Sequence, residues 1–262
     1  MASLLEGLRG QGVAADEAAL LFEAPDRRVY WVGADDGDEL RCNAYLACGP
    51  DANVLIDPGG RSHFADVRRR VGAAIDPSSL THLLVHHQDP DLCGSLPEWL
   101  AAYPSLRVVT SWRTSFFLRH YFAPGAPVPT AALVDRDAEL EAGLGLTFPA
   151  APFLHFPGAF VSYDPRSRFL FSGDILGASH ADGWTLVIDD FDAHLRALEP
   201  FHRNYMASNR ALRGFLANLE GLEIDAVLPQ HGAILEGEDA GRALAWLRDL
   251  RCGTDLLYPD PA

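Results

Sequence analysis

The sequence consists of two halves with the same order of expected elements, strands first and helices after them, and this order limits the folds that the chain can adopt. In each half, short runs of apolar, β-branched and aromatic residues end in turn residues and are followed by apolar residues at helical spacing. Two β-rich halves, each followed by helices, predict two packed sheets with helices outside them. With 262 residues and 48% hydrophobic content, the chain can bury a core of that size.

The expected elements follow the chain in order. In the first half, strands are expected at 27–33, 40–49, 52–60, 81–87 and 106–110, turns at 35–39 and 49–51, and helices at 62–71 and 95–103. In the second half, strands are expected at 144–150, 160–164, 168–174 and 224–232, a hairpin turn at 164–167, and helical segments at 191–222 and 238–253.

Charge and composition narrow the classes of partner. The formal net charge of −15 repels phosphate backbones, so we expect no nucleic-acid partner. No apolar run approaches the length of a membrane span or of a signal peptide, so we expect no membrane association and a cytoplasmic location. Reduced thiols fit that location, and Cys42 and Cys48, six residues apart on one expected strand, are poorly placed for a disulfide.

Metal-ligand side chains gather just past the ends of apolar runs. In chain order they are His87, Asp89, Asp91, His155, Asp174 and His231. If the loop after the strand at 81–87 is extended, residues 87, 89 and 91 point the same way and converge. Imidazole and carboxylate without thiolate suit Fe, Mn or Zn, and a carboxylate such as that of Asp174 can bridge two ions. Without metal, the carboxylates would leave like charges unpaired.

Several further polar and aromatic residues have structural explanations that need no metal. A lone histidine is most often exposed or satisfied in the core, which is our interpretation of His63, His82, His120, His180, His194 and His202. Asp57 is expected to support the site rather than bind metal, and Asp89-Pro90-Asp91 by itself would be a turn. Residues 175–185 are Gly-rich and could form a lid near Asp174, with His180 on it. We interpret the following aromatic residues as part of the hydrophobic core rather than as the lining of a gas-access pocket: Phe153, Phe156, Phe160, Trp184 and Tyr205.

Four separated segments carry a family resemblance. In order they are VYWVGADDGDELRCNAYLA, VHHQDPDLCGSLPE, FLFSGDILG and YMASNRALRGFLANLEGLEIDAVLPQHGAIL. They resemble the metallo-β-lactamase superfamily, and within it the di-iron domain of flavodiiron proteins and their flavin-free relatives, the oxygen-binding di-iron proteins. The resemblance runs from about residue 20 to 250. It implies a single α+β domain over residues 1–262, built as an αββα sandwich.

The resemblance also implies a ligand set. It assigns His87, Asp89 and His155 to a first metal, Asp91 and His231 to a second, and Asp174 to a bridging position, with no catalytic residue beyond these. The family's metal loop reads H-x-E-x-D-H, and two positions depart from it. Its Glu is the shorter Asp89, and its last His is Leu92, which cannot bind metal. His86 would replace the missing ligand only if the loop twists.

The function implied is binding or reduction of O2, or of NO, at two Fe ions, as a sensor or as an oxidoreductase. No flavin-binding domain is expected in this chain, so reduction needs an external electron donor and sensing a signalling partner. A homodimer is compatible with the resemblance. The first alternative is a Zn-dependent hydrolase, but Asp89 stands where that class has His and favours iron or manganese. The second is a metal-depleted binding module, which Leu92 favours.

Overall fold

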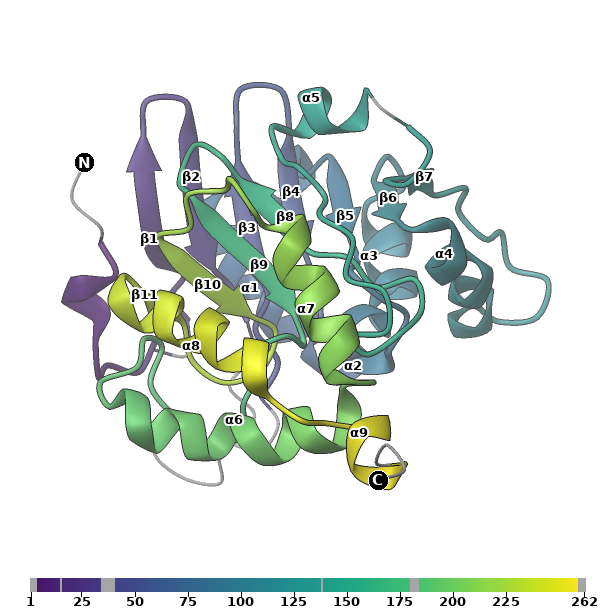
Figure 1. Cartoon of the computed structure of the whole chain (residues 1–262). Coiled ribbons are helices and arrows are strands. Elements are labelled where there is room, and N and C mark those ends of the chain that lie inside the picture. The colour runs from purple at the N-terminus through teal and green to yellow at the C-terminus, as the bar shows by residue number, and fades with distance from the viewer. Residues whose placement is uncertain (1–3, 15, 34–40, 138, 180–183, 259–262) are drawn as a thin grey trace.

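Two β-sheets lie face to face at the centre of the computed structural model, and helices cover their outer faces (Figure 1). The structure describes residues 4–14, 16–33, 41–137, 139–179 and 184–258. The expected turn at 35–39 lies outside these residues. The layers confirm the predicted αββα sandwich.

The first sheet is formed by the first half of the chain. Its strands follow one another in sequence order: β1 (Ala19–Ala24), β2 (Arg27–Trp31), β3 (Tyr45–Cys48), β4 (Asn53–Ile56), β5 (His82–Leu84), β6 (Arg107–Thr110) and β7 (Ala132–Leu133). Strands β1 to β4 pair antiparallel, and β4 to β7 pair parallel. Short turns join antiparallel neighbours, whereas parallel neighbours need longer crossovers, here containing helices. The three neighbouring strands predicted between 27 and 60 are therefore confirmed.

The second sheet is formed by the second half. Its spatial order is β11 (Leu235–Glu236), β10 (Ala226–Pro229), β9 (Phe169–Gly173) and β8 (Ser162–Asp164). The predicted strand at 144–150 is wrong as a full strand, because only Thr147 and Ala150 form isolated bridges, to Tyr163 and Phe160. Pro149 lies between them and has no N–H to donate to a ladder.

The helices connect and cover the strands. They are α1 (Phe64–Ala74), α2 (Pro90–Cys93), α3 (Leu96–Ala102), α4 (Trp112–Leu118), α5 (Leu140–Leu144), α6 (Phe191–Tyr205), α7 (Asn209–Asn218), α8 (Glu238–Asp249) and α9 (Thr254–Leu257). The helical region predicted at 191–222 is two helices, because Ser208 accepts a hydrogen bond from Ala211 N and caps a new one. Within the described residues, no helix has both the length and the apolar character to cross a membrane.

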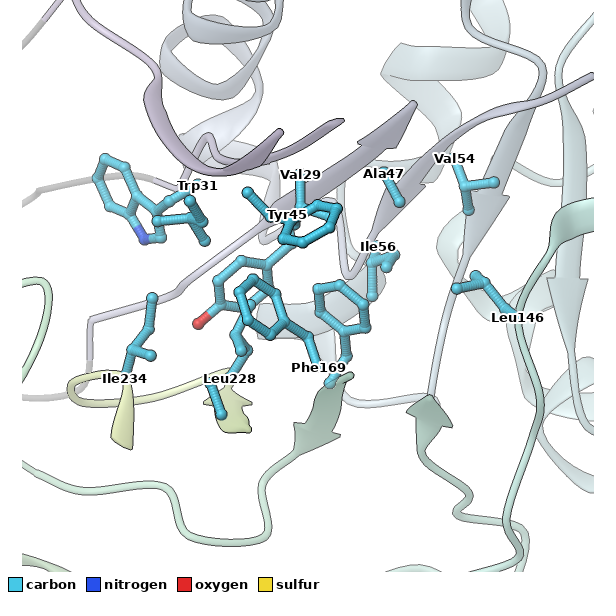
Figure 2. Close-up of a cluster of buried hydrophobic side chains, with 14 of the residues drawn as sticks. Val29, Trp31, Tyr45, Ala47, Val54, Ile56, Leu146, Phe169, Leu228 and Ile234 are labelled. Carbon is cyan, nitrogen blue, oxygen red and sulfur yellow. The ribbon is translucent and has the colours of Figure 1, made fainter. Parts of the chain in front are cut away.

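Apolar side chains from both sheets meet in the central layer (Figure 2). Tyr45 on β3 and Phe171 on β9 bring their ring centroids within 5.5 Å across this layer, and the Tyr45 hydroxyl donates to the carbonyl of Pro229 at 2.8 Å. Helices α1 and α3 pack on the outer face of the first sheet, and α6, α7 and α8 on that of the second. The sheets are thus held at a fixed separation, and the loops at their ends are held with them.

We predict that Phe171→Ala lowers the free energy of unfolding by about 3–5 kcal/mol, because it removes a buried ring between the sheets and leaves a cavity. Phe171 is 1% exposed, whereas Phe116, the control position, is 55% exposed. Phe116→Ala should cost less than about 1 kcal/mol. Denaturant unfolding of the two variants measures the difference, and equal losses would contradict the central position of Phe171.

Candidate metal centre

The loop after β5 carries the first three candidate ligands, but it is not extended as predicted. Asp89 precedes the short helix α2, and its carbonyl accepts hydrogen bonds from the N–H groups of Leu92 and Cys93, both at 3.1 Å. Pro90 occupies the first helical position, where its fixed φ favours a helix start. Residues 89 and 91 therefore do not alternate as they would in a strand, and their carboxylates enter two different clusters.

The first cluster contains two imidazoles and two carboxylates. Asp174 Oδ2 lies 3.0 Å from His87 Nε2 and 3.0 Å from His155 Nε2. Asp89 Oδ2 lies 3.2 Å from His155 Nε2 and 3.6 Å from His87 Nε2. The four side chains offer ligand atoms that all lie within 4.8 Å of one another. The structure thus brings together His87, Asp89 and His155, which the resemblance assigns to the first metal, with Asp174, which it assigns to the bridging position.

The second cluster adjoins the first through Asp174. His231 Nε2 lies 3.0 Å from Asp91 Oδ2 and 3.6 Å from Asp174 Oδ1. A third member, Cys42, has its Sγ within 4.8 Å of ligand atoms of Asp91 and His231. The sequence analysis did not predict Cys42 as part of the site, because it interpreted Cys42 as a reduced thiol on an expected strand. Leu92 is fully buried and offers no ligand atom.

Unsatisfied buried atoms indicate that this arrangement fits a metal. Among the described residues, neither His87 Nε2 nor Asp174 Oδ1 has a hydrogen-bond partner with acceptable geometry. Both side chains are almost fully buried, with exposures of 1% and 3%. A buried polar atom without a partner is costly, and a cation bound between these two atoms would satisfy both. Imidazole nitrogen with carboxylate oxygen suits iron, zinc or manganese.

Charges within the clusters shift several pKa values. Burial opposes the charged form of His87, but the carboxylates of Asp174 and Asp89 outweigh it and raise the pKa of that imidazole. Hydrogen bonds to the same two carboxylates raise the pKa of His155 to about 9. Burial also opposes protonation of His231, but Asp91 and Cys42 raise its pKa to about 10. Without metal, protons on the imidazoles therefore balance the carboxylates.

Cys42 and Asp174 have their pKa values lowered against the effect of burial. Burial would raise the pKa of the Cys42 thiol, but the imidazoles of His231 and His63 outweigh it. The pKa of the Asp174 carboxyl falls well below its ordinary value, because His87 and His155 outweigh its burial. In both groups the neighbouring imidazoles thus make the anionic, metal-binding form easier to reach.

Neighbouring side chains hold the ligands in place. Asp57 lies behind the metal loop, where its carboxylate accepts from His86 N at 3.0 Å and pairs with His86 Nδ1 at 2.6 Å. The other nitrogen of His86 lies 2.8 Å from Ser162 Oγ. His86 thus belongs to neither cluster, and the loop twist that would make it a ligand does not occur. Behind the second cluster, His231 Nδ1 lies 2.9 Å from the carbonyl of Arg41, which directs Nε2 towards Asp91.

The remaining sequence candidates are placed as follows. Phe160 and Trp184 are buried in the central core, whereas Phe153 and Tyr205 are more than half exposed. Tyr205 lies beside the site, with its ring centroid 5.8 Å from that of His155. His180 lies outside the described residues, so the predicted lid is described only in part.

One side of the clusters is open to solvent. The side chains of His155, Asp89 and Asp91 are 23%, 30% and 32% exposed, whereas His87 and His231 are 1% and 2% exposed. A small molecule can therefore approach from the side of the two carboxylates and His155. The two buried imidazoles, His87 and His231, follow the largely buried strands β5 and β10.

We predict that affinity for a divalent metal rises with pH above 7, because His155 and His231 carry protons in the metal-free protein until about pH 9 and 10. Each displaced proton should raise the binding constant about tenfold per pH unit below these values. Competition with a chromophoric chelator, with Co2+ as the metal, measures the slope. An affinity that levels off near pH ~6.5, as for ordinary imidazoles, would contradict the raised pKa values.

Relatives of the chain include a flavo-diiron protein and a nitric oxide reductase. The flavo-diiron protein FprA2 of Clostridium acetobutylicum is 26% identical over 201 residues, which make up 75% of this chain and 50% of the relative. The anaerobic nitric oxide reductase flavorubredoxin of Pectobacterium carotovorum is 24% identical over 236 residues, or 81% of this chain and 45% of the relative. The chain thus spans about half the length of these two relatives.

A solved structure matches over nearly its whole length. The chemotaxis sensor ODP, solved as a peroxy diiron species, is 31% identical with a TM-score of 0.79, and the match covers 92% of this chain and 98% of that one. Its apo state, from T. denticola, matches with the same identity and TM-score. In addition, a family model described as ODP family beta lactamase matches residues 40–232. The chain therefore belongs to the ODP family of β-lactamase-like proteins.

Proposed function

We propose that this chain is an oxygen sensor that binds O2 at a non-haem di-iron centre. The observation that carries the proposal is that two clusters of metal-ligand side chains adjoin each other at the buried carboxylate of Asp174, which belongs to the first cluster and has one oxygen 3.6 Å from His231 of the second. The side chains that would hold the two ions are His87, Asp89, Asp91, His155, Asp174 and His231.

Each ligand would have a distinct role. Asp174 has one oxygen near His87 and His155 and the other near His231, so it would contribute to holding both ions. His87 and His155, with Asp89, would hold the first ion, and Asp91 and His231 the second. When bound, two ferrous ions supply the electrons and the coordination positions with which O2 or NO reacts. The partly exposed carboxylates of Asp89 and Asp91 would border the path of the gas.

Sensing is favoured over sustained reduction because this chain matches a sensor over nearly that protein's whole length, but matches a reductase over less than half of it. The match to the chemotaxis sensor covers 98% of that chain, whereas the reductase named above is matched over 45% of its length. Repeated reduction of O2 or NO would need an external electron donor, whereas sensing would need a signalling partner. For this reason we place O2 binding first and keep O2 or NO reduction as the second function of the same centre.

We predict that anaerobically loaded protein holds two Fe2+ ions per chain and gains a visible absorption band on exposure to O2. His87→Ala should lose the ion of the first cluster and the band, because it removes a buried ligand atom. His82→Ala is the matched control: His82 begins β5, the strand before the loop that carries His87, and its Nδ1 lies 2.8 Å from Thr81 Oγ1, outside both clusters. It should keep both ions.

Elemental analysis and absorption spectra of the three proteins decide between the functions. An iron-loaded chain without any O2-dependent change would contradict the proposal. A protein that purifies with filled zinc sites and turns over an ester or phosphodiester would favour the hydrolase alternative. Little bound metal under all conditions would favour the metal-depleted binding module.

A further inference from the structure

We propose that the thiolate of Cys42 is a ligand of the second metal ion and supplies the donor that Leu92 lacks. The inference rests on the proposed di-iron centre and names one more of its ligands. Three observations support it: the way the backbone holds Cys42, the atoms that surround its sulfur, and the charge balance of the site.

The backbone holds Cys42 against the loop that carries His231. Cys42 and His231 form an antiparallel bridge, and Asn43 N donates to the carbonyl of Gln230 at 2.6 Å. The Asn43 amide nitrogen donates to the carbonyls of Pro229 and Gly232, both at 2.9 Å. The segment at 41–43 and the loop at 229–232 are therefore held together by hydrogen bonds. This pairing brings the backbone of Cys42 beside that of His231.

Two further contacts fix the same segment. Trp31 Nε1 donates to Asn43 Oδ1 at 2.8 Å, so the amide of Asn43 is held at both ends. A Cβ atom on Gly33 would lie 2.7 Å from the carbonyl oxygen of Cys42, so only glycine allows the chain to cross there. Gln230 also reaches the metal loop, since its Nε2 lies 3.3 Å from the carbonyl of Asp91. All three members of the second cluster are thus tied together.

The atoms around the sulfur are those of a metal site. Sγ of Cys42, a carboxylate oxygen of Asp91 and a ring nitrogen of His231 lie within 4.8 Å of one another. Cys42 and His231 are 3% and 1% exposed. Asp174 Oδ1, which lacks an acceptable hydrogen-bond partner among the described residues, lies 3.6 Å from His231 Nε2. An ion between these groups would satisfy the unpaired oxygen.

The charge balance favours a thiolate. Without Cys42, the ligands of two divalent ions carry three negative charges, from Asp89, Asp91 and Asp174. Four positive charges in a largely buried site would then lack one counter-charge, which is unfavourable at low dielectric. A thiolate at Cys42 makes the site neutral. The thiol proton leaves to solvent when the sulfur–metal bond forms, and no electron is transferred.

In the part of the chain that the structure describes, the other cysteines do not lie beside a carboxylate and an imidazole that could bind metal with them. Cys93 donates its thiol to the carbonyls of Gln88 and Asp89, both at 3.3 Å. Cys48 lies on β3 and Cys252 packs in the core beneath α8. Neither Cys48, Cys93 nor Cys252 joins a metal-ligand cluster among the described residues. Cys48, a buried thiol at the end of β3 that contacts no proposed ligand loop, provides the matched control.

The test uses Co2+ as the probe, because a thiolate bound to Co2+ gives a sulfur-to-metal charge-transfer band in the near ultraviolet. The full chain loaded with two Co2+ ions should show this band. Cys42→Ser should lose it and bind the second ion at least about tenfold more weakly, since even supporting groups of metal ligands cost 10–100-fold. Cys48→Ser should keep both the band and the affinity.

A second measurement needs no variant. X-ray absorption of the zinc-loaded wild-type chain should show a sulfur neighbour at about 2.3 Å from part of the metal. Two bound ions without a sulfur neighbour or a charge-transfer band would overturn the Cys42 ligand and leave the di-iron centre standing. A band that persists in Cys42→Ser would also overturn it. A chain that binds neither metal would overturn both this inference and the proposed function.

Discussion

The buried carboxylate of Asp174 is the group around which the site is arranged. A carboxylate that is 3% exposed is unstable unless cations surround it, and here imidazoles of His87, His155 and His231 do so. These side chains come from both halves of the chain, so they meet only when the two sheets pack. In the absence of metal, protons on the imidazoles supply the positive charge. Metal ions would replace those protons, which joins metal binding to the packing of the fold.

Much of this could be predicted from the sequence, because strands and ligands leave local signals. The apolar runs at 52–60, 168–174 and 224–232 all contain strands, and ligand-type residues follow strand ends in a regular way. The break between α6 and α7 was missed, because the apolar spacing continues across Ser208 and only its capping hydrogen bond reveals a new helix. The short helix α2 was missed because a His-Gln-Asp-Pro-Asp segment resembles a turn as much as a helix start.

Cys42 could not be predicted as part of the site for a different reason. Its neighbours His231 and Gln230 are about 190 residues away in sequence, and the bridge between residues 42 and 231 is a feature of the folded chain only. A cysteine in an apolar run is usually a small buried hydrophobic residue, which is what Cys48 is. Only the pairing that turns Cys42 towards Asp91 and His231 distinguishes the two.

Leu92, which stands where the family's metal loop has a histidine, therefore changes the ligands of the second metal ion, and Cys42 would supply the missing one. The first cluster has two imidazoles and two carboxylates, whereas the second has one imidazole, two carboxylates and a sulfur when Asp174 is counted in both. A thiolate is a softer and more electron-rich donor than imidazole, so it favours iron or zinc over manganese at the second position. The two ions would then have different sets of ligands, although both sets include Asp174. Because Asp89, Asp91 and His155 are the partly exposed side chains of the site, a gas molecule would approach from their side and away from the buried sulfur of Cys42.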